Sequence, residues 1–232
     1  MKNYKTLLVI AGVLAALALT ASPALAAKKK HNLERRIRLS SEYFEVVMQE
    51  PGGGIPSYIL GNARGIIILR QYKIGLGIGI KGGSGIVMIR KGNTNSWSPP
   101  AFLKTGEGSI GIQAGGQIMD TVYLLMDDEG MSLLSKPKFR IGIDAAAAAG
   151  SHDAGAEAKL SSGTPILVYS NTAGLYAGAT FEGGFLLPDN KANATYYGNP
   201  DITMHEILFT NEVTFPDSAK VLVAAIKKYS TR

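Results

Sequence analysis

The amino-acid sequence predicts an α+β fold: a curved, mostly antiparallel, glycine-rich β-sheet or partial barrel packed with N-terminal helices and a C-terminal helix. Glycine alternates with apolar residues from Ile74 to Ile80, which is typical of a strand with one buried face. Apolar residues also recur at helical spacing near both ends of the chain. Glycine inside a strand normally weakens it unless another backbone comes close or a bulge bends the sheet. The stretch from Gly75 to Gly116 therefore predicts closely packed, bent strands.

Three segments have the pattern of helices. The first runs from about Asn32 to Gln49 and is ended by Glu50, Pro51 and three glycines. A short helix is predicted from Pro56 to about Asn62, with Pro56 in its first turn. The closing helix lies between Phe215 and Tyr229. Its last turn contains Lys227 and Lys228, which suit the negative end of the helix dipole.

Strands are expected between these helices, in chain order at 65–70, 72–80, 86–90, 110–116, 121–126, 139–144, 145–149, 166–170 and 175–181. A turn is predicted at Gly82–Gly85, a polar loop at 91–95 and a rigid turn at Trp97-Ser98-Pro99-Pro100. Residues 127–130 read as a turn, or a short helix begins at Gly130. The segment 145–149 is interpreted as a strand although alanine favours helix, and the last two strands are predicted to form a hairpin around 171–174.

Positive charge is concentrated near the N-terminus. The chain has a formal net charge of +6, and eight of its 24 Lys and Arg residues lie in the first 38 residues with only one acid, Glu34. The remainder is close to neutral, which favours an anionic surface as partner over a nucleic-acid groove. Residues 1–26 have a charged start, an apolar core and a small-residue end, which predict a secretory signal peptide cleaved after Ala26. An uncleaved membrane anchor is the alternative.

No motif indicates catalysis. The chain has no cysteine, which excludes disulfides, thiolate metal sites and a lipid-modified cysteine. Gly77, Gly79 and Gly82 match the dinucleotide fingerprint in letters, but a strand rather than a helix follows them. His31, His152 and His205 are scattered without metal-ligand spacing. Asp127, Asp128 and Glu129 read as a solvated turn. We therefore expect no enzyme activity, no cofactor and no metal.

An ordered series of motifs resembles the SYLF family of lipid-binding domains, over roughly Leu33 to Tyr229. The motifs are Ile55-Pro56, 63–66, 83–90, 97–100, 106–115, 138–144, Tyr169-Ser170, 174–178, 181–183, Asn193 and 196–198. The resemblance implies a module that binds phosphoinositides or other anionic lipids through a basic amphipathic N-terminal helix, here Lys28 to Met48. Eukaryotic relatives carry SH3 or FYVE domains, and yeast relatives take part in actin binding.

This chain departs from the eukaryotic pattern because it has the predicted signal peptide and no partner domain. Actin is therefore not expected as a partner, and envelope lipids such as phosphatidylglycerol or cardiolipin replace inositol lipids. Six further residues of these motifs are interpreted mainly as fold-setting: Trp97, Pro99, Pro100, Asp144, Glu182 and Tyr197. A ligand role stays open for the two acids.

These observations predict a signal peptide at 1–26, a basic amphipathic helix at 27–50 and a SYLF-like body at 51–232. The predicted function is non-catalytic binding of anionic phospholipid headgroups by an exported, periplasmic or extracellular, peripheral membrane protein. An envelope scaffold without lipid specificity is the alternative. The residues predicted to contact lipid are six cations and three apolar residues: Lys28, Lys29, Lys30, Arg35, Arg36, Arg38, Leu33, Ile37 and Phe44. The apolar residues are expected to enter the headgroup boundary.

Overall fold

The computed structural model describes residues 23–50, 54–92, 94–141, 147–149, 164–172 and 185–230. Two helices precede the first strand, α2 (Pro23–Met48) and α3 (Ser57–Asn62). Two 25-residue strands follow, β1 (Gly65–Ile89) and β2 (Ala101–Leu125). The remaining elements are α4 (Asp128–Ser132), η1 (Leu133–Ser135), β3 (Ala147–Ala149), β4 (Ile166–Thr172), β5 (Phe185–Pro188), α6 (Asn190–Tyr197), α7 (Met204–Phe209), η2 (Asp217–Ala219) and α8 (Lys220–Tyr229).

The strands form one sheet with the order β1-β2-β4-β3, and β5 also pairs with β2. All the pairings are antiparallel except that between β3 and β4, which is parallel. β1 pairs with β2 along nearly its whole length, so β4 and β5 share the opposite edge of β2. β4 pairs with Met119–Leu125 and β5 with Leu103–Gly106. The two long strands are therefore the framework of the sheet.

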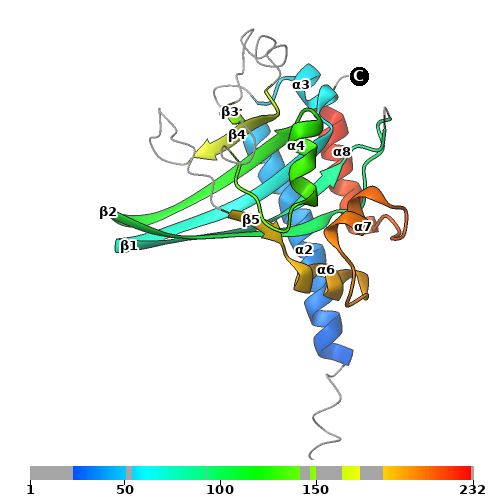
Figure 1. The fold of residues 1–232 in the computed structure, drawn as a ribbon, viewed down its shortest axis with the longest axis horizontal. Coiled ribbons are helices and arrows are strands. Elements are labelled where there is room, and N and C mark those ends of the chain that lie inside the picture. The colour runs from blue at the N-terminus through cyan, green and yellow to red at the C-terminus, as the bar shows by residue number, and fades with distance from the viewer. Residues whose placement is uncertain are drawn as a thin grey trace, which may run out of the picture.

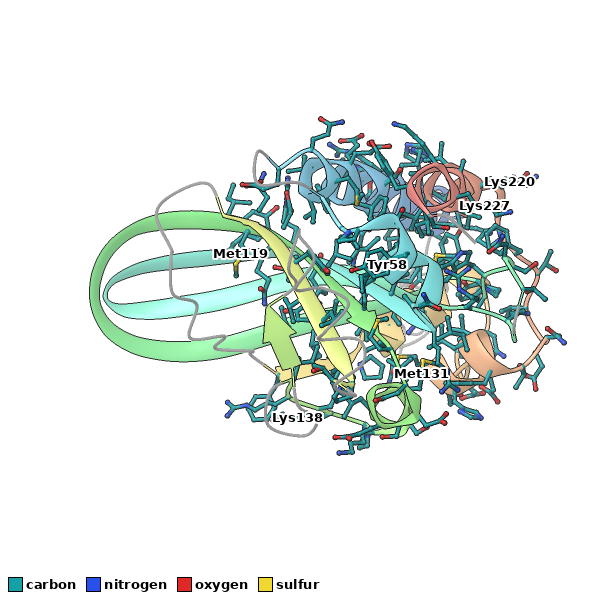
Figure 2. The ribbon with its side chains drawn as sticks, turned by 90° about the horizontal axis from the view of Figure 1, so that it is seen from above. Tyr58, Met119, Met131, Lys138, Lys220 and Lys227 are labelled. Carbon is teal, nitrogen blue, oxygen red and sulfur yellow. The ribbon has the colours of Figure 1, made fainter. Side chains whose placement is uncertain are left out.

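β1 and β2 curve back on themselves and form nested U-shapes that project from the body of the domain (Figures 1 and 2). Their pairing register shifts between Leu76 and Ile78. The predicted turn at Gly82–Gly85 is wrong, because these residues remain in β1 and pair with Leu103–Gly106. A Cβ atom at Gly85 would overlap the carbonyl oxygen of Ile68. The glycine is there because the two arms of β1 come close together, and it does not reverse the chain.

Each face of the sheet contributes to its own apolar cluster. Ile66, Ile68 and Met88 pack in one cluster with residues of α2, α3, α6 and α8. Their strand neighbours Ile67 and Leu69 pack in the other, with η1 and α7. In Figure 1, α2 and α8 lie behind the sheet while α4 lies in front of it. Alternation along the strands thus produces two buried faces, which accounts for the continuous apolar runs.

The predicted α+β class is confirmed, and so are the first, second and closing helices in outline. α2 begins earlier than expected, and α3 follows Pro56 as predicted. The three strands expected within 65–90 form one long strand, and so do the two expected within 110–126. The short helix near Gly130 is present as α4. Residues 142–146 and 173–184 lie outside the described residues, as does the predicted signal peptide up to residue 22.

Sequence patterns did not reveal β5, α6 or α7. α7 begins with a capping box in which Thr203 and Glu206 bond each other's backbone amides. α6 has Asp189 as its N-cap, and Gly198 ends it in the left-handed conformation. These cap residues were a readable signal for both short helices. Their few apolar positions are too short a series to show a helical period.

Candidate membrane-facing helix

The N-terminal half of α2 is a solvent-exposed helical segment rich in lysine. Its side chains from Leu25 to Asn32 are all exposed, including the three consecutive lysines, Lys28, Lys29 and Lys30. Arg35 and Arg38 are exposed one and two turns further on. In Figure 1 this end of α2 extends beyond α6 and away from the sheet. Five of the six cations predicted to contact lipid are therefore accessible from solvent.

The C-terminal half of α2 is part of the core. Ile37 and Phe44 have 0 % relative exposure and pack in the cluster that contains Ile66 and Ile68. The ring of Phe44 also makes an edge contact with that of Tyr229 in α8, with centroids 6.0 Å apart. The prediction that Ile37 and Phe44 enter a membrane is wrong for this conformation, because both already fill the protein interior. Leu33 is half-buried against the same cluster.

The prediction that Arg36 contacts a lipid headgroup also needs correction. Its guanidinium is 3.1 Å from the Asp189 carboxylate. It donates hydrogen bonds to the carbonyl oxygens of Gly85 and Leu103 and lies 5.2 Å from the centroid of the Phe102 ring. Burial lowers the pKa of Arg36, and the hydrogen bond to Asp189 opposes that change. Arg36 therefore fastens α2 to β1, β2 and the start of α6.

The helical spacing contained a signal for this role. Arg36 precedes the buried residues Ser40 and Phe44 by four and eight positions, which places it on the same face of α2. Arg35 and Arg38 lie on other faces and are exposed. Charge alone had grouped the three arginines, whereas the helical period separates Arg36 from its neighbours.

Two further arginines hold the sheet and were not anticipated. Arg70 on β1 binds the Asp120 carboxylate on β2 through two hydrogen bonds of 2.7 and 2.5 Å, at directly paired positions. Its guanidinium carbon lies 3.8 Å from the ring centroid of Tyr43 in α2. The hydrogen bond to Asp120 raises the pKa of Arg70. α2 covers β1 as far as this contact between Arg70 and Tyr43, and Tyr72 beyond it is exposed.

The second is Arg90, which is 7 % exposed. It donates to the carbonyl oxygens of Leu60 and Ala63 and lies 4.5 Å from the ring centroid of Trp97. Trp97 is itself buried, and the hydroxyl of Tyr197 donates to the Pro100 carbonyl oxygen over 2.7 Å. These contacts fit the fold-setting role predicted for the Trp97–Pro100 turn and for Tyr197. Asp144 and Glu182 lie outside the described residues.

Few features of the described residues could support chemistry. These residues contain no group of three or more His, Cys, Asp or Glu side chains able to hold a metal ion. An open pocket of about 360 Å³ lies between η1 and the start of α7, lined equally by apolar residues and by polar ones that include Lys136, Asp201 and His205. The ring of His205 stacks on Phe209 at 4.9 Å. None of the described helices has the length and apolarity required to span a bilayer.

Comparison with known proteins agrees with the resemblance seen in the motifs. The Ysc84 family, described as "Las17-binding protein actin regulator", matches residues 106–229. An SH3 domain-containing protein of Schizosaccharomyces pombe is 31 % identical over 173 residues, which cover 72 % of this chain and 40 % of that protein. Protein YSC84 of Saccharomyces cerevisiae is 28 % identical over 178 residues, or 75 % of this chain and 37 % of its own length.

Animal proteins are similar to a comparable degree. The human SH3 domain-containing YSC84-like protein 1 is 27 % identical over 184 residues, which cover 78 % of this chain and 53 % of that protein. The chain thus corresponds to about two fifths to three fifths of the length of these curated relatives. None of these names describes an enzyme. No solved structure matches the chain. The family match over more than half of the sequence identifies this chain as a member of the Ysc84, or SYLF, family.

Proposed function

We propose that this protein binds anionic phospholipid surfaces, without catalysis, through the exposed basic half of α2. The observation that carries the proposal is the contrast along this one helix. Its C-terminal half is fixed in the core, its N-terminal half presents Lys28, Lys29, Lys30 and Arg35 to solvent, and Arg38 is exposed just beyond them. A rigid helix that holds several cations at its free end is suited to a flat anionic surface.

The proposed contact is mainly electrostatic. Each basic residue near an anionic membrane contributes about 1 kcal/mol, and salt screens this attraction within a Debye length of about 8 Å at physiological ionic strength. Five exposed cations therefore support reversible binding that weakens as salt is added. The burial of Ile37 and Phe44 favours this mode over a wedge made by the apolar face of α2. Location at a membrane face of the cell envelope, after export, is part of the same proposal.

Co-sedimentation with vesicles tests the proposal. Vesicles of phosphatidylcholine with 30 % phosphatidylglycerol should bind the protein, and vesicles of phosphatidylcholine alone should not. Changing Lys28, Lys29 and Lys30 to Glu should reduce binding by about 100-fold or more, since three attractive charges are lost and three repulsive ones are added. Changing Lys104, Lys136 and Lys138 to Glu gives a control of identical net charge at exposed positions outside α2.

Equal loss in both triple variants would reject a role specific to α2. Binding that ignores both the lipid charge and the α2 substitutions would instead favour the envelope scaffold. The names of the relatives refer to actin regulation, so co-sedimentation of the protein with filamentous actin provides a parallel measurement. We expect no specific binding there, because a protein with the predicted signal peptide would be exported away from actin.

A further inference from the structure

β1 and β2 both bend in the middle, and this bend, here called the curved end of the β1–β2 hairpin, has an unusual composition. From Ile74 to Ile80 the chain contains only glycine, isoleucine and leucine, and from Gly108 to Gly116 it contains no charged residue. These two segments lie in the middle of β1 and β2, where the strands bend back on themselves at the tip of the projection in Figures 1 and 2. The hairpin therefore carries an uncharged segment at the part of the molecule farthest from its core.

The base of this projection is exposed and apolar. Tyr72 and Ile118 lie directly opposite each other on β1 and β2, with relative exposures of 44 % and 51 %. Six large apolar side chains are exposed among the described residues, and these two are the ones that lie in the sheet. The others belong to helices: Leu25, Val46, Phe209 and Val221. An exposed cross-strand pair at the start of an uncharged hairpin end marks an interaction surface.

This surface continues the face of the sheet that α2 covers. Alternate residues of a strand share a face, and Ile66 and Ile68 on β1 pack against α2. Arg70, the next residue on this face, contacts Tyr43 of α2. Tyr72 follows it and is exposed. The helix therefore covers this face as far as Arg70 and leaves the apolar pair beyond it open.

The sequence around the uncharged segment indicates what covers it. Lys73 and Lys81 bracket the run from Ile74 to Ile80, and Tyr72 stands just outside it. Apolar or small residues pair with each other along this run, and polar pairs flank it. The former pairs include Ile74–Gly116 and Leu76–Ala114; the latter include Lys73–Gln117 and Lys81–Glu107. Lysine and tyrosine at the border of an apolar segment are typical of the interface of a lipid bilayer.

We infer that the curved end of the β1–β2 hairpin is a second membrane contact, which enters the headgroup region with Tyr72 and Ile118 at its border. This inference rests on the proposed function, since α2 supplies the electrostatic attraction that brings the protein to the surface. The hairpin end adds the apolar contribution that the buried residues of α2 do not provide. The ligand is the bilayer itself, and Lys73 and Lys81 favour anionic lipids.

The absence of native cysteine allows a direct test. Single-cysteine variants Tyr72→Cys and Ile118→Cys are labelled with an environment-sensitive fluorophore, as are the control variants Val221→Cys and Phe209→Cys at exposed apolar positions in α8 and α7. Each is mixed with vesicles of phosphatidylcholine and 30 % phosphatidylglycerol. We expect blue-shifted, stronger emission at positions 72 and 118, quenched by lipids brominated in the acyl chain, and no change at 221 and 209.

Co-sedimentation of the same samples separates the two proposals. If the protein binds these vesicles but positions 72 and 118 do not respond, the hairpin contact is refuted and the role of α2 stands. If the protein binds no vesicles, both fail. A response that appears without lipid and grows with protein concentration assigns this surface to a second copy of the chain and overturns the inference. Tyr72→Ser with Ile118→Ser should weaken vesicle binding by roughly tenfold, while Val221→Ser should leave it unchanged.

Discussion

The two halves of α2 differ in what surrounds them. Each half mixes apolar and charged side chains, but the C-terminal half is enclosed by β1, β2 and α8 and the N-terminal half extends past α6. Arg35 and Arg36 show the difference at adjacent positions. Arg35 is exposed, whereas Arg36 binds Asp189 and two backbone carbonyl groups. The lesson is that what surrounds a helix decides whether its arginines stabilise the fold or remain available to a partner.

Phe44→Ala should give the largest effect on folding. Removal of a fully buried phenyl ring that contacts Tyr229 leaves a cavity, and we expect the free energy of unfolding to fall by about 3–5 kcal/mol. Urea denaturation measures this change. The matched control Val46→Ala, two residues away at an exposed position, should change the free energy by about 0.5 kcal/mol or less. Similar losses in both variants would contradict the burial of Phe44 in the core.

Arg36→Gln should give an intermediate effect. The substitution removes the ion pair with Asp189 and the hydrogen bonds to the carbonyl groups of Gly85 and Leu103, so we expect a loss of about 1–3 kcal/mol in unfolding free energy. In a double-mutant cycle with Asp189→Asn, the two changes should be less than additive. If Arg36→Gln instead weakened vesicle binding at unchanged stability, Arg36 would be a headgroup contact after all.

Arg35→Gln should give the smallest effect on the fold and a measurable one on binding. Because Arg35 is exposed on α2, the unfolding free energy should stay within about 0.5 kcal/mol of the original. Vesicle affinity should fall about fivefold, which corresponds to the loss of about 1 kcal/mol from one basic residue. Titration with vesicles at two salt concentrations measures this, and the difference between the variants should shrink at the higher concentration.

Sequence patterns predicted the class of fold and the helices at both ends, because these helices repeat apolar residues over several turns. They failed where long-range contacts decide. Gly82–Gly85 read as a turn, yet Gly85 lies where β1 approaches its own first arm at Ile68. Arg70 and Asp120 are 50 residues apart, and only the strand register brings them together. The sequence does not show which distant residue each of these contacts, so each could be interpreted only from its neighbours along the chain.

The candidate site was predicted in part. The cluster of cations was apparent from the sequence, and Lys28, Lys29 and Lys30 are exposed because they precede Leu33, the first residue of α2 that packs against the core. The apolar contacts were misassigned because an amphipathic helix has the same pattern whether its apolar face meets a membrane or a sheet. Only the packing of Ile37 and Phe44 against β1 and α8 distinguishes these cases.

The pairing of α2 with α8 also has a consequence for how the chain acquires its structure. Ile37 and Phe44 share one cluster with Ala219, Leu222 and Ile226, which lie nearly at the other end of the sequence. These residues leave the ribosome long after α2 has been made, so the cluster lacks part of its lining until they emerge. During this interval Phe44 has no Tyr229 to contact, and the apolar face of α2 remains partly exposed to water.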